Sequence, residues 1–439
     1  MKNISIIGLG KLGSPMLATY ASKGFNVIGV DVSRTIIDCI NKGKSPIKEE
    51  RVELLIKQNR NRIKVTNNIE KAVSSSDITF IIVPTPSDET GGFLIDYVLD
   101  SCQKIGKALS QKSDYHLVVL VSTVLPGASL DKIIPVLEKF SGKKCGKDFG
   151  YCYSPEFIAL GSVVKDLLNP NFFLIGEHDK KSGEILESFY RKISENKDVV
   201  VERMSISSAE LTKISLNSYV TMKITFANIL GKICNKMPGA DIDKVTQALG
   251  RDKRIGQYFL KAGLSYGGPC FPRDNQAFSY MANKLGVETP LADLTHTCNI
   301  IFIDYVLDLI LSNAKKGVTI AIFGLAYKPD TPVVEESAAL IIAQKLIKKG
   351  YNICIYDPLT YENVKPILDN KARYCRTIKE CLENASVYFV SYPKKEFEII
   401  AKFLSGKSGK TLIDPWRQFR KFKLEKIKGL KYVPFGIGK

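Results

Sequence analysis

Histidine is scarce in this chain of 439 residues, which contains only His116, His178 and His296. None of the three stands at the spacing of a metal-binding motif or of a catalytic triad. This scarcity argues against a histidine general base and against a catalytic zinc centre. We therefore expect no metal site, and we expect Cys, Lys, Asp or Glu to carry any proton or covalent chemistry.

Long apolar runs and closely spaced cysteine pairs are also missing. No apolar stretch reaches the length expected of a membrane-spanning helix, and the first strand-like run, Ile4 to Gly8, is too short for the core of a signal peptide. The ten cysteines are scattered without CxxC pairs, so a disulfide framework is not expected. These absences predict a soluble, cytoplasmic protein with no membrane partner.

Acidic residues are outnumbered, with 45 Asp and Glu against 63 Lys and Arg, which gives a formal net charge of +18. Three interpretations are open: a nucleic-acid partner, the attraction of dianionic substrates and cofactors, and a bias toward lysine without function. The basic residues are spread along the whole chain and form no single block. We therefore expect no nucleic-acid partner.

The N-terminal part of the chain alternates short apolar runs with segments of helical length. The runs typical of buried strands are Ile4–Ile7, Val27–Val30, Ile78–Val83, Leu117–Ser122 and Phe172–Ile175. Helical patterns such as Leu12–Lys23 and Leu130–Phe140 lie between them. This βαβ alternation predicts a parallel, doubly wound sheet.

The alternation stops after about residue 203 and returns at Val318. Ser207 to Glu210 has the pattern of a capping box, and a long helix is expected from there to about Lys236. The predicted fold class is α/β, with two Rossmann-like doubly wound parallel-sheet lobes joined by a long-helix, all-α middle domain. The predicted domains are 1–203, 204–312 and 313–439, and the long helix suggests a homodimer or higher homo-oligomer.

A glycine-rich segment follows the first predicted strand and opens the first helix. Gly8 permits a tight turn, Gly10 lets a pyrophosphate approach the backbone, and Gly13 allows the helix to pack closely on the strand. Lys11 and Leu12 lie at the start of the helix, where free N–H groups and the helix dipole attract phosphate. The pattern predicts a dinucleotide site, and an ordinary tight turn is the alternative interpretation.

Asp31 ends the second predicted strand, 18 residues beyond Gly13. A carboxylate at this point binds the ribose hydroxyls of a dinucleotide and repels a 2′-phosphate, which favours NAD over NADP. Arg34 belongs to the same predicted site, and its positive charge leaves NADP open.

The segment from Gly263 to Asp274 reads GLSYGGPCFPRD and places Cys270 after two glycines. Glycines let a backbone pass close to a ligand, and a thiolate is a strong nucleophile toward an aldehyde. The alternative interpretation is a buried structural cysteine in a glycine-rich loop.

The GLSYGGPCFPRD segment resembles the signature of the UDP-glucose/GDP-mannose dehydrogenase family. The resemblance extends over nearly the whole chain, because further motifs occur in family order. They are Gly8–Gly13, Val83–Pro86, Ser122–Val124, Ser154–Phe157, Ala209–Asn217, Arg254–Gly256 and Gly324–Lys328.

The resemblance implies an NAD-dependent oxidation of a nucleotide sugar in two successive hydride transfers. Cys270 would capture the aldehyde as a thiohemiacetal, which is then oxidised to a thioester and hydrolysed. Lys213 and Asn217 stand four residues apart on one predicted helix, and would stabilise an oxyanion and hold a water. Without the resemblance, such a pair is also typical of a solvated helix face.

The resemblance also implies roles for the remaining site residues. Asp274 would be the general base of the first oxidation, and Glu156 would activate the hydrolytic water that Thr123 positions. The expected cofactor contacts beyond the glycine loop are Thr85, Pro86, Thr123 and Arg273. The expected substrate contacts are Glu156, Phe157, Lys213, Asn217, Arg254, Lys261, Tyr266, Gly267, Lys328 and Arg417.

The sequence departs from the family pattern in loops that the resemblance places near the substrate. The segment Ile158 to Gly161 lacks the usual Arg and Glu, Glu335 replaces an Arg, Arg273 replaces a Lys, and Asp414 to Arg417 differs from the usual DGR. UDP-glucose, oxidised to UDP-glucuronate, is the first expected substrate, and a UDP-N-acetylhexosamine or GDP-mannose is the alternative. A catalytically silent nucleotide-binding protein and a single-step hydroxyacid dehydrogenase are alternatives of other classes.

Overall fold

The computed structural model describes residues 2–158 and 160–438. The chain forms two compact units, Met1–Ser215 and Leu216–Lys439, and each is described by itself. The boundary between them falls within one long helix, α9 (Ile206–Lys236). The division into three domains at residues 203 and 312 stays a prediction.

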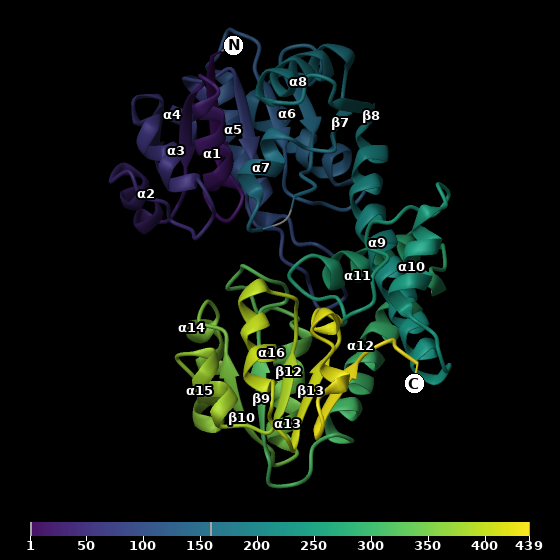
Figure 1. The fold of residues 1–439 in the computed structure, drawn as a ribbon. Helices are drawn as coiled ribbons and strands as arrows, with labels where there is room; N and C mark the ends of the chain where they lie inside the picture. Colours follow the sequence, from purple (N-terminus) through teal and green to yellow (C-terminus); the bar gives the residue numbers. More distant parts are fainter. Residues whose placement is uncertain (1, 159, 439) are drawn as a thin grey trace. The chain divides into compact units, whose positions relative to one another are not determined.

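The first unit is built on an eight-stranded sheet in the order β3-β2-β1-β4-β5-β6-β7-β8. Figure 1 draws this unit in purple to teal, with the N-terminus marked. All neighbouring strands are parallel except β6 and β7. The strands are β1 (Asn3–Ile7), β2 (Asn26–Val30), β3 (Ile63–Thr66), β4 (Ile78–Ile81), β5 (Leu117–Leu120), β6 (Gly150–Tyr153), β7 (Phe172–Glu177) and β8 (Val200–Ser205). The chain reverses its winding direction between β1 and β4, where ligands of doubly wound sheets bind.

Helices cover both faces of this sheet because successive strand residues point to opposite sides. Ile6 of β1 packs in one apolar cluster with α1 and α7, whereas Ile7 packs in a second cluster with α5 and α6. The helices are α1 (Gly13–Ser22), α2 (Arg34–Asn41), α3 (Val52–Gln58), α4 (Ile69–Ser74), α5 (Asp96–Ser110), α6 (Ile134–Ser141), α7 (Val163–Leu168) and α8 (Lys180–Ile193).

The second unit contains a six-stranded parallel sheet in the order β11-β10-β9-β12-β13-β14. Its strands are β9 (Thr319–Phe323), β10 (Asn352–Tyr356), β11 (Arg373–Tyr374), β12 (Val387–Val390), β13 (Lys410–Asp414) and β14 (Leu430–Pro434). The strand order matches that of the first six strands of the first unit, so both sheets reverse direction beside their first strand.

The helices of the second unit divide between a helical section and the two faces of this sheet. They are α10 (Ile242–Arg251), α11 (Phe271–Lys284), α12 (Pro290–Leu311), α13 (Ala338–Lys348), α14 (Tyr361–Leu368), α15 (Ile378–Glu383) and α16 (Ile399–Leu404). One apolar cluster joins α12, α13 and α14 to the sheet, and the other joins α15 and α16 to the opposite face. The predicted fold class, two parallel-sheet lobes with a helical middle, is confirmed.

Five strands, β3, β6, β8, β11 and β14, were not anticipated from the sequence. The predicted capping box at Ser207 to Glu210 is wrong, because α9 begins earlier and the Ser205 hydroxyl accepts the bond from the Ser208 N–H at 3.3 Å. The Glu210 carboxylate instead binds the backbone N–H groups of Gly127 and Ser129.

One helix, α12, is long and apolar enough to cross a membrane by length and composition, with a mean hydropathy of 1.5 over its most apolar 18 residues. The expectation that no apolar stretch reaches this length is therefore wrong. The helix is nonetheless packed as a core element, since Phe302, Val306 and Ile310 are buried against the second unit. Its Asn299 side chain binds the backbone of Tyr266 through both its oxygen and its nitrogen.

Candidate functional site

The glycine loop between β1 and α1 has the geometry that a dinucleotide phosphate requires. Gly8 has a φ of +96°, and a Cβ at Gly13 would lie 1.8 Å from the Gly8 carbonyl oxygen, so neither position tolerates a side chain. A Cβ at Gly10 would face open space, and Gly10 and Lys11 are both exposed. Leu12 is the residue before α1, whose free N–H groups face this loop. The residues present therefore fit a dinucleotide pyrophosphate.

The Asp31 carboxylate lies beside the glycine loop, at the end of β2. One oxygen accepts the Leu9 N–H at 2.8 Å and the other accepts the Ser33 N–H at 2.8 Å. These bonds fix the carboxylate and leave further lone pairs for ribose hydroxyls. Arg34 is exposed at the start of α2.

The loops after β4 and β5 meet at the same edge of the sheet. The Thr85 hydroxyl donates to the Thr123 carbonyl at 2.8 Å, and the Ser122 hydroxyl donates to the Val83 carbonyl at 2.6 Å. Thr85, Pro86 and Thr123 therefore lie beyond the carboxyl ends of the central strands, where the predicted cofactor contacts belong.

Glu210 is a positioning residue that the sequence analysis missed. Its buried carboxylate accepts the Gly127 N–H at 2.8 Å and the Ser129 N–H at 3.0 Å, which anchors the loop that follows Thr123. No local signal marked this role, because Glu210 stands among polar residues of α9 and the capping-box pattern gave it another explanation.

Glu156 and Lys213 lie together in the first unit. The Lys213 ammonium donates to the Glu156 carbonyl at 2.7 Å and stands 4.7 Å from the centre of the Phe157 ring. Burial raises the pKa of the Glu156 carboxyl to about 7, and the positive charge of Lys213 opposes this rise. A carboxyl group with such a pKa exchanges protons near neutral pH, as a general acid or base requires. Ala159, in the same segment, lies outside the described residues.

Cys270 caps the N-terminus of α11 and is the one exposed cysteine of the ten, all of which the structure describes. The N-terminal end of a helix carries a partial positive charge, which stabilises an anion such as a thiolate. The position therefore favours a reactive thiol, and a buried structural role for Cys270 is excluded.

Asp274 lies one turn into α11 and is held by two side chains. The Asn217 amide donates to one carboxylate oxygen at 2.6 Å, and Arg273 donates to the other through Nε and Nη2 at 3.0 and 2.9 Å. Asn217 and Asp274 are both buried. The carboxylate thus orients the Asn217 amide, in addition to its predicted role as a base. The prediction that Lys213 and Asn217 reach one oxygen is not tested by these contacts.

The loop before Cys270 passes directly against the segment after β9. The Gly268 N–H donates to the Glu335 carbonyl at 3.0 Å, and a Cβ at Gly267 would lie 2.1 Å from the Glu336 carbonyl oxygen. The Lys328 ammonium stands 5.9 Å from the centre of the Tyr327 ring in this segment. The structure thus joins the Gly267 and Lys328 motifs. Glu335 makes this contact through its backbone carbonyl, so the contact does not depend on the side chain at that position.

Two buried asparagines hold the extended segment that leads to Cys270, and the sequence analysis missed both. Asn228 of α9 binds the Gly263 N–H and the Leu264 carbonyl, while Asn299 of α12 binds the N–H and carbonyl of Tyr266. Asparagine is unfavourable inside a helix, so its presence in two apolar helices was a usable signal.

The predicted substrate cations differ in their surroundings. Arg254 is highly exposed and pairs with Asp252 at 2.6 Å, and Lys261 is exposed. Arg417 is only 4 % exposed and binds both oxygens of Asp243 at 2.9 Å. It also donates to the carbonyls of Pro415, Phe435 and Ala262. These partners occupy the guanidinium of Arg417 and give it a structural role. The predicted contact of Arg417 with the substrate stays a prediction.

We predict that Arg417→Ala lowers the free energy of unfolding by about 3 kcal/mol, because the carbonyls of Pro415, Phe435 and Ala262 lose their buried donor. Urea unfolding of the full chain measures this loss. Arg254→Ala is the matched control, and is expected to change stability by less than about 0.5 kcal/mol because its ion pair is exposed. Equal stability of the two variants would contradict the structural role of Arg417.

Comparison with known proteins covers almost the whole chain. Residues 2–194 match the NAD binding domain of the UDP-glucose/GDP-mannose dehydrogenase family, residues 207–300 its central domain, and residues 321–421 its UDP binding domain. The chain is 35% identical to a GDP-mannose 6-dehydrogenase of Pseudomonas putida, over 94% of this chain and 95% of that protein. It is 32% identical to a UDP-glucose 6-dehydrogenase of Haloferax volcanii, over 94% and 96%.

A solved structure has the same fold along its whole length. It is a UDP-glucose dehydrogenase from Pyrobaculum islandicum, which matches with a TM-score of 0.88 and 28% identity over 100% of this chain and 98% of that one. These matches confirm the resemblance seen in the motifs and the expected NAD cofactor. This chain belongs to the UDP-glucose/GDP-mannose dehydrogenase family.

Proposed function

We propose that this protein is an NAD-dependent 6-dehydrogenase that oxidises the CH₂OH group of a nucleotide sugar to a carboxylate, with UDP-glucose as the first candidate substrate. The observation that carries the proposal is the exposed Cys270 thiol at the N-terminus of α11, next to the Asn217–Asp274–Arg273 network. A single-step hydroxyacid dehydrogenase has no need of this thiol, and a silent binding protein has no need of either feature.

Gly8, Gly10 and Gly13 would hold the pyrophosphate of NAD, and Asp31 would bind its ribose hydroxyls. NAD⁺, when bound, accepts the hydride that leaves the sugar carbon in each of the two oxidations. The alcohol, two NAD⁺ and one water thus give the carboxylate, two NADH and three protons.

Cys270 acts between the two oxidations. Its sulfur bonds to the aldehyde carbon and gives a thiohemiacetal. The oxygen of this thiohemiacetal accepts a hydrogen bond from the Asn217 amide as negative charge develops. Loss of the second hydride leaves a thioester on Cys270. Water then adds to the thioester carbon, the carbon–sulfur bond breaks, and the acid leaves.

Glu156 is proposed to take the proton from the hydrolytic water, with Thr123 positioning that water. Because the pKa of Glu156 is raised to about 7, its basic form is present above neutral pH and is lost as the pH falls through this value. We therefore predict that the rate of thioester hydrolysis falls tenfold per pH unit below about 7. The measurement is kcat against pH with single-turnover detection of the acyl-enzyme.

Glu156→Gln is expected to slow hydrolysis by about 10²–10³-fold and to remove this acidic limb. Thr123→Val is a milder companion variant, which leaves the limb in place because the base remains. An acidic limb that persists in Glu156→Gln assigns the titration to another group.

The function is tested with the purified full chain, NAD⁺ and a panel of UDP-glucose, GDP-mannose and UDP-N-acetylhexosamines. Two NADH per sugar, with formation of the uronate, is the expected result for the preferred substrate. One NADH per substrate would indicate single-step chemistry, and no NADH with any sugar would indicate a silent binding protein. A parallel assay with NADP⁺ tests the contribution of Arg34 beside Asp31.

GDP-mannose is the second candidate substrate. The chain is 35% identical to the GDP-mannose 6-dehydrogenase of Pseudomonas putida and 32% identical to the UDP-glucose 6-dehydrogenase of Haloferax volcanii, each over 94% of this chain. The panel separates the two by their kcat/KM ratio. The loops that depart from the family pattern are those on which this ratio is expected to depend.

We also propose that the protein acts in the cytoplasm as a homodimer. The long helix α9 exposes one apolar face, and α12 exposes further apolar side chains. These residues are Tyr219, Phe226, Ile229 and Ile233 of α9, and Leu294 and Ile301 of α12, each at least 41 % exposed. Apolar area of this kind is typical of an interface between subunits. Light scattering of the wild type and of Phe226→Asp tests the dimer, which the charge is expected to dissociate.

A further inference from the structure

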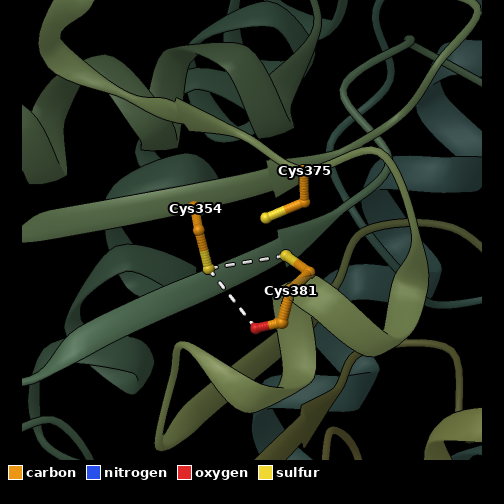
Figure 2. A group of neighbouring side chains, drawn as sticks. All are labelled: Cys354, Cys375 and Cys381. Carbon is orange, nitrogen blue, oxygen red and sulfur yellow. Dashed lines mark hydrogen bonds between the residues drawn. The ribbon is translucent and has the colours of Figure 1, made fainter.

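Three cysteines converge inside the second unit although they are far apart in the sequence. Cys354 lies on β10, Cys375 directly follows β11, and Cys381 lies on α15. Figure 2 shows the three side chains pointing toward one another from these three elements. Their sulfur atoms all lie within 4.8 Å of one another, and those of Cys354 and Cys381 are 3.4 Å apart. None of these thiols takes part in the proposed reaction.

We propose that Cys354, Cys375 and Cys381 form a binding site for a soft divalent d¹⁰ metal ion of the zinc type. Thiolates are the ligands that select such ions. With zinc–sulfur bonds of about 2.3 Å, three sulfurs around one ion stand roughly 4 Å apart. The observed separations therefore require only small side-chain adjustments.

A fourth ligand lies beside the three sulfurs. The Cys381 carbonyl oxygen is 3.5 Å from the Cys354 sulfur (Figure 2). It belongs to the last turn of α15, where carbonyl groups lack partners within the helix. Three sulfurs and this oxygen would give the coordination number of four that structural zinc sites have.

The surroundings fit a closed structural site. All three cysteines have 0 % exposure and are packed among apolar residues such as Leu382 and Tyr388. Binding releases the three thiol protons to solvent as three metal–sulfur bonds form. A divalent ion then leaves one net negative charge, whereas a monovalent ion such as Cu⁺ leaves two, which costs more in an apolar interior.

Two other arrangements of these thiols are less suited to the geometry. A disulfide between Cys354 and Cys381 requires the sulfurs to approach to about 2.05 Å and leaves the third thiol without a role. Simple apolar packing does not require three sulfurs, contributed by three different elements, to converge on one point. No metal site was expected from the sequence because the three histidines lack metal-binding spacing, whereas the three cysteines are brought together only by the sheet and α15.

The test uses the full chain with Cys270→Ala as background, so that the exposed thiol binds no metal. After dialysis against excess zinc and then buffer, we expect about one zinc per chain. Cys375→Ala and Cys381→Ala are each expected to lose it, and the matched control Cys102→Ala, a buried cysteine of the first unit, to retain it. Titration with Cd²⁺ is expected to give a thiolate charge-transfer band in the background protein and the control alone.

Zinc content that is equal in all these proteins would overturn the proposal, as would binding of Cu⁺ without binding of Zn²⁺ or Cd²⁺. Mass spectrometry under non-reducing conditions checks the disulfide, whose presence in the purified protein also overturns it. If the variants fail to fold, X-ray absorption of the zinc-loaded background protein tests the site instead, because it counts the sulfur neighbours of the zinc ion. Three sulfur neighbours support the site, and fewer than three contradict it.

Discussion

Cys270→Ser is expected to lower uronate formation at least about 10³-fold, because an alkoxide is far less available than a thiolate at neutral pH. Cys270 lies exposed at the start of α11, so the substitution removes one nucleophilic atom and no packing. The expected product pattern is as informative as the rate. With no thioester, the yield falls from two NADH per sugar to one or fewer. Acid quench, mass spectrometry and NADH absorbance together measure both.

Cys298→Ser is the matched control, since Cys298 is a partly buried cysteine of α12 with no proposed chemistry. It is expected to keep two NADH per sugar and a kcat close to that of the wild type. Full turnover to the acid by Cys270→Ser would refute the covalent route while leaving a nucleotide-sugar dehydrogenase in place.

Asp274→Asn is expected to lower kcat by about 10²–10⁴-fold. The substitution preserves shape but removes the charge that Arg273 and Asn217 both bind, at 2.9 and 2.6 Å. The Asn217 amide then loses its fixed orientation. The carboxylate proposed as general base of the first oxidation is removed as well. Steady-state kinetics at saturating sugar and NAD⁺ measure the effect, and thermal unfolding verifies that the variant is folded.

The contact between Asn217 and Asp274 also predicts how their variants combine. If Asp274 acts largely by orienting Asn217, Asn217→Ala plus Asp274→Asn loses little more activity than the worse single variant. Additive losses would instead assign Asp274 an independent role as the base. Arg273→Lys, which restores the residue usual in the family, is the mild control and is expected to cost less than about tenfold because the charge is retained.

The sequence located most elements that matter for function because each has a local signature. The glycine loop and Asp31 at the end of β2 depend on short-range spacing and turn chemistry, whereas α11, which begins after Cys270, was not anticipated. The missed strands β3, β6, β8, β11 and β14 have weaker patterns. β8, for example, is the last strand of its sheet and most of its side chains are partly or fully exposed, so no continuous apolar run marks it.

Local pattern also misled the analysis where a side chain has a distant partner. The Ser207 to Glu210 pattern suggested a capping box, but Glu210 binds a loop 81 residues earlier in the chain at Ser129. The resemblance placed Arg417 at the substrate, which stays a prediction, but its ion pair with Asp243, 174 residues away, was not anticipated. Neither partner is visible in the neighbouring sequence.

The sequence by itself determined the fold class and the dinucleotide loop, since backbone periodicity and glycine requirements act over a few residues. Only the tertiary structure decided which side chains act together: Asp274 with Asn217 across 57 residues, and Cys354 with Cys375 and Cys381. It also decided the environment of Glu156, whose pKa is raised because the folded chain removes water from the carboxyl group. Burial and long-range contact are properties of the packed chain, and they set the chemistry of residues whose identity alone leaves it open.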